Sequence, residues 1–168
     1  MKISLITPAK KRSKNGNRTT ALRWARILRD LGHKVEISVK YEGQNADLMI
    51  ALHAWRSASS IKLFRDIYPD RPLVLALTGT DINEFIRTDP KPTLKSMETA
   101  DALVCLHDLA VDVIPKKFRQ KLQVIYQSAP PLTKKRQPAR SHFDICLIKI
   151  LCEEPWRFAK CRKAQSSG

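Results

Sequence analysis

One stretch of the sequence has a composition suited to anion binding: PAKKRSKNGNRTTALRWARIL, residues 8–28, is rich in lysine and arginine and contains no acid. It is predicted to join a buried strand to an amphipathic helix, whose first free amides favour an anion. Gly16 and Asn17 are expected to form a tight turn into this helix, with Asn17 or a following threonine as its cap. Arg18 would be the nearest fixed guanidinium, able to hold a phosphate through two hydrogen bonds. The alternative is a solvated basic loop followed by an ordinary helix cap.

Polar side chains also follow three other predicted strands, at the point where each strand ends. They are His53 with Arg56, the segment Thr78-Gly79-Thr80-Asp81, and Gln127 with Ser128. Because parallel strands end at one edge of a sheet, these groups are expected to lie at the same edge. Each also has an ordinary reading: a structural histidine, a turn with a helix cap, or the start of a linker. Together, basic groups around one carboxylate suit an anionic substrate.

The elements that must position these residues alternate along the chain. Short apolar runs predict strands at residues 1–7, 35–39, 47–52, 73–77, 102–106 and 122–126. Helices are predicted at 20–31, 57–67, 92–99 and 107–114. The first helix has one apolar stripe, Ala21, Trp24, Ala25, Leu28 and Leu31, and Gly32 as its C-cap. This alternation predicts an α/β fold, a Rossmann-like parallel sheet with helices on both faces.

The composition favours anionic partners and disfavours several common enzyme classes. The chain has 168 residues, 43% hydrophobic and 28% charged, with a formal net charge of +15. Such a charge attracts polyanions, phosphorylated ligands or anionic lipid surfaces. With only five glycines, the chain has neither a GxGxxG fingerprint nor a Walker loop, which disfavours classical NAD binding and P-loop hydrolysis. No HExxH, GxSxG or zinc-ligand spacing occurs, so no metal is assigned.

The cysteines and the first residues indicate the compartment. Cys105, Cys146, Cys152 and Cys161 form no CxxC pair, and we assign them no functional role. The apolar run at residues 3–6 is too short for a signal-peptide core or a membrane span. These features predict a reduced, cytoplasmic setting without a membrane span.

The character of the chain changes after residue 128. Residues 1–128 contain every strand and helix described above and are predicted to form one domain. Residues 129–141, APPLTKKRQPARS, combine proline and basic residues without an apolar period, which is typical of a linker. The apolar segment FDICLIKIL follows at 143–151, so residues 142–168 are expected to be the truncated start of a second domain.

Several segments taken together carry a family resemblance. They are KISLITPA, GNRTTALRWARILRDLGH, DLMIALHAWRSA, RPLVLALTGTDI, ADALVCL and VIYQSAPP. Over residues 1 to about 148 the chain resembles the N-terminal half of a GT-B glycosyltransferase, and within that group the selenosugar synthases of selenoneine biosynthesis. The combination of GNRxTALRWA, LHAxRS, LTGTD and YQSAPP is specific, whereas any one of these motifs alone would be weak.

The resemblance implies a fold and a reaction. Two Rossmann-like domains would face a cleft, and a sugar would pass from a UDP-sugar, expected to be UDP-N-acetylglucosamine, to selenophosphate. No catalytic metal or cofactor is implied. It also implies a set of site residues: Asp81 and His53 as catalytic, Gly16, Asn17, Arg18, Arg56 and Thr80 on the acceptor or anion side, and Gln127 and Ser128 at the hinge.

The sequence departs from the family after residue 148. In the family, a glycine-containing loop with an arginine and a nearby lysine grips the donor diphosphate. Residues 149–156 read KILCEEPW here, without the glycine or the basic pair in those places. The departure predicts that residues 142–168 are a truncated or frame-disturbed fragment of the nucleotide-sugar-binding domain. A chain of this kind is expected to be inactive without a C-terminal half.

A basic nucleic-acid-binding module is the alternative function. Its support is the net charge and two acid-free stretches, residues 1–29 and 113–143. Proteins that bind single strands expose aromatic side chains among their basic residues. Trp24 and Phe118 instead fall in segments predicted to pack, which favours the glycosyltransferase over specific binding of nucleic acid.

Overall fold

The computed structural model describes residues 1–13 and 15–128, which belong to one compact unit, Met1–Ala129. All strands of the described part join a single parallel sheet, so the predicted Rossmann-like α/β fold is confirmed. The strands are β1 (Lys2–Ile6), β2 (Lys34–Ser38), β3 (Leu48–Leu52), β4 (Leu73–Ala76), β5 (Ala102–Cys105) and β6 (Leu122–Val124). The predicted linker and second-domain fragment lie outside the described residues.

The order of the strands creates a switch point in the sheet. The order is β2-β1-β3-β4-β5-β6, with Ile3 of β1 in register with Val35 on one side and Leu48 on the other. The chain therefore leaves β1 toward one edge and continues from β3 toward the other. In open α/β sheets the carboxyl ends of strands at such a switch form a crevice that binds ligands. Here the switch point lies between β1 and β3, so the loops that follow these two strands flank it.

Helical segments connect the strands. They are α1 (Gly16–Asp30), α2 (Ala58–Ile67), the π-helical turn η1 (Asp81–Phe85), α3 (Ile86–Thr88), α4 (Pro90–Thr99), α5 (Ala110–Val113) and the 3-10 segment η2 (Lys116–Lys121). The segment 81–88 and η2 were not predicted as helical. The predicted helix at 107–114 is shorter, because only Ala110–Val113 is α-helical.

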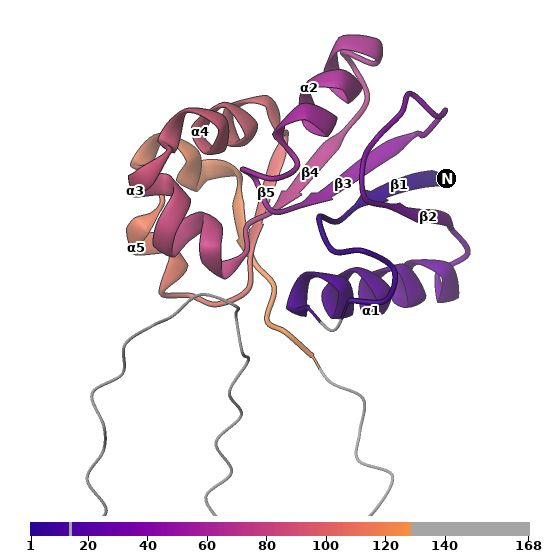
Figure 1. Cartoon of the computed structure of the whole chain (residues 1–168), viewed down its shortest axis with the longest axis horizontal. Coiled ribbons are helices and arrows are strands. Elements are labelled where there is room, and N and C mark those ends of the chain that lie inside the picture. Colours follow the sequence, from indigo (N-terminus) through magenta and orange to yellow (C-terminus); the bar gives the residue numbers. More distant parts are fainter. Residues whose placement is uncertain (14, 129–168) are drawn as a thin grey trace, which may run out of the picture. The chain divides into compact units, whose positions relative to one another are not determined.

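The helices cover the two faces of the sheet with separate apolar clusters. On one face Ala21 and Ala25 of α1 pack against Ile3 and Leu5 of β1. Figure 1 shows α1 on this side and α2 with α4 on the other. On the second face Phe64 of α2 and other side chains of α2, α4 and α5 pack against β3, β4 and β5. Burial on both faces explains why the strands read as continuous apolar runs.

The two ends of α1 differ in part from the expectation. The helix begins at Gly16, and its cap is Asn15, whose side chain accepts a hydrogen bond from the amide of Asn17. The predicted cap at Asn17 or a later threonine is therefore wrong, because those residues already lie inside the first turn. At the other end Gly32 takes a left-handed φ of 85°, as expected of a residue that ends a helix. Leu31 is 68% exposed and does not belong to the apolar stripe.

Candidate functional site

Three of the predicted site residues form one hydrogen-bonded chain. His53 directly follows β3, and Thr80 and Asp81 follow β4, the neighbouring strand. Nδ1 of His53 lies 2.6 Å from Oδ1 of Asp81, and Nε2 lies 3.0 Å from Oγ1 of Thr80. The backbone amide of Arg56 also lies 3.3 Å from Nδ1, but the shorter contact with a carboxylate places the proton on Nδ1. His53 is thereby held as the tautomer whose Nε2 is free to accept a proton.

The carboxylate of Asp81 is fully engaged. Besides His53, its Oδ1 accepts a hydrogen bond from the amide of Trp55 at 3.2 Å. Its Oδ2 accepts from the amide and the hydroxyl of Thr78, at 3.0 and 3.1 Å. The side chain is 0% exposed, so these donors replace water around a buried charge. Asp81 is thus a fixed anchor for His53.

The backbone at His53 is strained. Its φ is 73°, in the left-handed region that residues other than glycine seldom adopt. Such a conformation costs on the order of 1–3 kcal/mol and persists where the surroundings impose it. The amide of His53 donates to the carbonyl of Ala76 on β4, and its carbonyl accepts from the amide of Ser57. The strained turn directs the imidazole toward Asp81 as the chain leaves the sheet.

An aromatic pair beside His53 was not anticipated from the sequence. Trp55 stacks on Phe85 with ring centres 4.5 Å apart, and Phe85 lies 5.6 Å from the His53 ring. The exposed guanidinium of Arg56 lies 6.0 Å from the centre of the Phe85 ring. Phe85 ends the π-helical turn η1, a conformation frequent at functional sites. The aromatic residue within LHAWRSA was the one available signal.

The start of α1 holds the predicted anion-binding residues. Gly16, Asn17 and Arg18 occupy its first turn, which contains no acid. Arg18 is only 9% exposed, and its Nε has no hydrogen-bond partner among the residues that the structure describes. Burying a cation without a partner is costly, so this position suits an anion that supplies the partner. No hydrogen bond or ion pair joins Arg18 to the His53–Asp81 pair within residues 1–13 and 15–128.

Gln127 and Ser128 return to the same helix. The Gln127 amide donates to Oγ1 of Thr20 at 2.9 Å, and Nε of Arg23 donates to Oγ of Ser128 at 2.6 Å. The segment 125–128 therefore runs from the edge strand β6 back to α1, as Figure 1 shows for the orange trace below the sheet. These contacts bring the GNRTT and YQS motifs together, separately from the His53 cluster.

Cys105 closes β5 at the same edge of the sheet. Its side chain is fully buried, and this burial raises the pKa of the thiol above its ordinary value. A hydrogen bond from the backbone of His107 opposes the effect without cancelling it. The thiol is therefore protonated near neutral pH and does not provide a nucleophile to the site.

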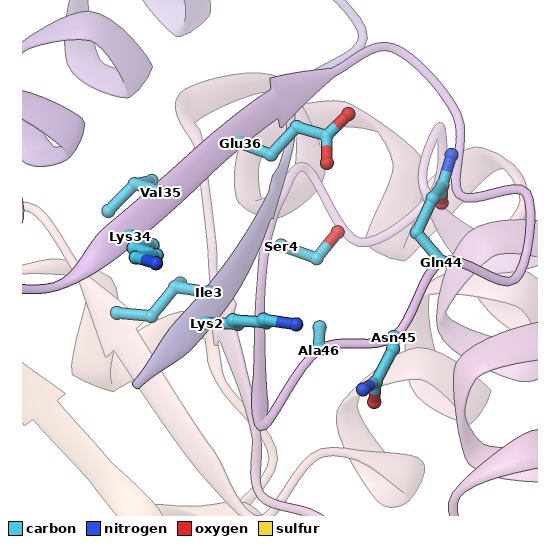
Figure 2. A pocket seen from close by; sticks show the side chains of 9 residues that line it. All are labelled: Lys2, Ile3, Ser4, Lys34, Val35, Glu36, Gln44, Asn45 and Ala46. Carbon is cyan, nitrogen blue, oxygen red and sulfur yellow. The ribbon is translucent and has the colours of Figure 1, made fainter.

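Two hollows in the surface lie away from these residues. One, of about 330 Å³, is lined by the first halves of β1 and β2 and by residues 44–46. Figure 2 shows its mixture of polar side chains, with the Lys2 amine directed toward Ala46 and Asn45. It lies at the amino ends of the strands, opposite the edge that carries His53. A second hollow lies between α2 and α4.

Neither a metal cluster nor a membrane helix is found in the described part of the chain. There, no three histidine, cysteine, aspartate or glutamate side chains come close enough to hold an ion. No helix within residues 1–13 and 15–128 is both long and apolar enough to cross a bilayer.

The fold and the site place the chain in the general class of α/β proteins with a parallel sheet. The chain contains an α/β domain with a six-stranded parallel sheet, whose polar residues gather at the carboxyl ends of the strands. No protein-family model matches the sequence, and no curated protein is similar to it at a significant level.

Proposed function

We propose that this chain is the acceptor-side domain of a glycosyltransferase. The proposed reaction moves a sugar from a UDP-sugar, with UDP-N-acetylglucosamine as the donor, to selenophosphate. The observation that carries the proposal is the pairing of the motifs behind the GT-B resemblance. His53 of LHAWRS bonds to Asp81 and Thr80 of LTGTD, and Thr20 of GNRTT bonds to Gln127 of YQS.

The charges at the switch point support a small anionic acceptor. The acid-free start of α1 presents the positive end of the helix dipole, although the amides of Asn17, Arg18 and Thr19 already donate to Asn15. Arg18 adds a buried side chain whose Nε lacks a hydrogen-bond partner among the described residues. Selenophosphate offers several oxygen atoms to such donors. The same features fit inorganic phosphate, which makes phosphate a usable competitor.

The His53 cluster supports proton handling beside this anion. Asp81 orients His53, and Nε2 of the imidazole keeps a lone pair toward Thr80. When selenium attacks the anomeric carbon, a protonated acceptor must lose its proton, and a positioned base accelerates such a step. The groups expected to hold the donor diphosphate lie at 149–156, outside the described residues.

The test is calorimetry of selenophosphate binding to the full chain in a reducing, anaerobic buffer. We expect saturable binding at one site, displaced by inorganic phosphate and not by equal concentrations of chloride. A single-stranded RNA titration is the comparison, because binding through diffuse charge alone weakens steeply as salt rises. Sequence-dependent RNA binding that persists at physiological salt, with no selenophosphate binding, would instead support the nucleic-acid alternative.

A further inference from the structure

The members of the Asp81–His53–Thr80 chain differ sharply in their access to solvent. Asp81 is 0% exposed and His53 is 1% exposed, so neither side chain can touch a ligand bound outside. Thr80, in contrast, is an exposed residue. Its hydroxyl lies 3.0 Å from Nε2, so Thr80 is the exposed residue at the end of an otherwise buried network. A ligand at this edge would therefore meet Thr80 rather than His53.

The short contact between Nδ1 of His53 and Asp81 favours one arrangement of the protons in this network. Because Nδ1 of His53 donates to Asp81, Nε2 of the neutral imidazole carries a lone pair. The Thr80 hydroxyl is then the donor in the contact with Nε2. Its oxygen keeps lone pairs that can accept a hydrogen bond from outside. Thr80 thus resembles the hydroxyl of a hydroxyl–imidazole–carboxylate relay.

The hydroxyl of Thr80 is not committed to its helix. Thr80 precedes η1 but already has helical backbone angles, φ −71° and ψ −30°, so its side chain is not placed to cap the helix. The hydroxyl makes no hydrogen bond to a first-turn amide and points to His53 instead. Asp81 in turn accepts from the amide of Thr78. The local helix therefore does not explain the orientation of the hydroxyl.

We propose that Thr80 is a catalytic residue that transfers a proton between a bound acidic ligand and the buried imidazole. The proposal rests on the proposed acceptor chemistry, and its ligand class is a protonated, phosphate-like anion. The ligand's O–H or Se–H bond breaks as its proton moves to Oγ1 of Thr80. The Thr80 O–H bond breaks as its own proton moves to Nε2 of His53. The ligand gains one negative charge, and the imidazolium that forms is paired with Asp81.

This proposal assigns different roles within the chain of three residues. Thr80 contacts the ligand, whereas His53 receives the proton without contacting it. Asp81 is a positioning residue, because it fixes the tautomer of His53 and stabilises the imidazolium. Apart from Asp81, no charged side chain in the described part of the chain forms an ion pair with His53.

The test follows the protonation of the His53 ring by nitrogen NMR in the full chain at neutral pH, during titration with inorganic phosphate. A His53→Asn variant assigns the signal, because asparagine tolerates the left-handed backbone. In the native chain we expect Nε2 to change from unprotonated to protonated as phosphate binds. Thr80→Ser keeps the hydroxyl, so the phosphate-induced protonation of Nε2 should stay within about twofold of that in the native chain. Thr80→Val keeps the shape and should reduce the response at least about tenfold.

The outcomes separate this proposal from the proposed function. If phosphate binds to the native chain and His53 stays neutral, the relay is wrong and the anion site stands. An equal His53 response in native and Thr80→Val chains likewise overturns the relay. If phosphate does not bind at all, the anion site and the relay both fail. Thermal unfolding of both variants checks that the fold is intact, which the exposure of Thr80 leads us to expect.

Discussion

Nδ1 of His53 and Oδ1 of Asp81 are 2.6 Å apart in the interior, and the acid also binds two backbone amides. Asp81→Ala leaves all of these donors without an acceptor. We expect it to lower the free energy of unfolding by about 3–5 kcal/mol. Urea denaturation followed by circular dichroism measures this change. Asp66→Ala is the control, since Asp66 forms an exposed pair with Lys62 and should cost less than about 1 kcal/mol. Similar losses for the two variants would contradict the importance of the buried pair.

Arg18 should dominate the binding of small anions. Loss of a charge-assisted contact from a buried guanidinium costs about 2 kcal/mol, whereas loss of a solvated lysine costs well under about 1 kcal/mol. We therefore expect Arg18→Ala to weaken phosphate binding far more than Lys11→Ala, where the lysine is exposed. Calorimetry at constant ionic strength measures both affinities. Equal losses would mean that the basic loop attracts anions only through diffuse charge.

The same arginine is expected to reduce the stability of the free domain. Arg18 is buried and its Nε has no hydrogen-bond partner within residues 1–13 and 15–128, which is unfavourable, so Arg18→Met should raise the free energy of unfolding by about 0.5–2 kcal/mol in phosphate-free buffer. Added phosphate should stabilise the native chain and not the variant. Arg26→Met provides the control, because the Arg26 side chain is 83% exposed and should change stability by less than about 0.5 kcal/mol. A destabilised Arg18→Met chain would show that Arg18 serves the fold.

Cys105 predicts a pH dependence of stability. Burial holds the pKa of its thiol above the ordinary value of 9.0, so the folded chain keeps this proton while the unfolded chain loses it. The buried, protonated thiol therefore contributes stability at pH values below 9.0. This contribution is lost as pH rises from just below 9.0 through the pKa of the folded chain. Urea unfolding of native and Cys105→Ala chains between pH 8 and 10, in reductant, gives the difference. The free energy of unfolding should fall more over this range for the native chain than for Cys105→Ala. Parallel pH dependences of the two chains would rule out an effect of the buried thiol.

Most of the fold can be predicted from the sequence because the sheet is buried on both faces. LMIAL (48–52) and LVLAL (73–77) are continuous apolar runs bounded by polar residues or proline, and such runs have few alternatives to a parallel strand. The segment 81–88 was not predicted as helical, although Ile82, Phe85 and Ile86 have helical spacing, because the segment is short and begins with a π-helical turn. Asn15 and Asn17 are equivalent as caps in the sequence, and only the backbone shows which residue precedes the helix.

The candidate site was predictable as residue types at one edge, but not as contacts. His53 and Asp81 were expected at the same edge of the sheet, but the sequence did not predict that β3 and β4 are neighbours. Their bond depends on the left-handed backbone of His53, which no local sequence signal requires. The stacking of Trp55 on Phe85 also depends on the unpredicted helical turn. Burial of Arg18 is a tertiary effect, since most arginines in a basic loop are solvated.

The return of residues 125–128 to α1 also sets an order of events during synthesis. Thr20 leaves the ribosome long before Gln127, which is 107 residues further along the chain. The sheet can begin to form from β1, β2 and β3 as they emerge, since neighbouring segments assemble first. The contacts of Thr20 and Arg23 with this segment can close only after β6 has been made. The start of α1, with its proposed anion-binding residues, is therefore among the last parts of the domain to become fixed during translation.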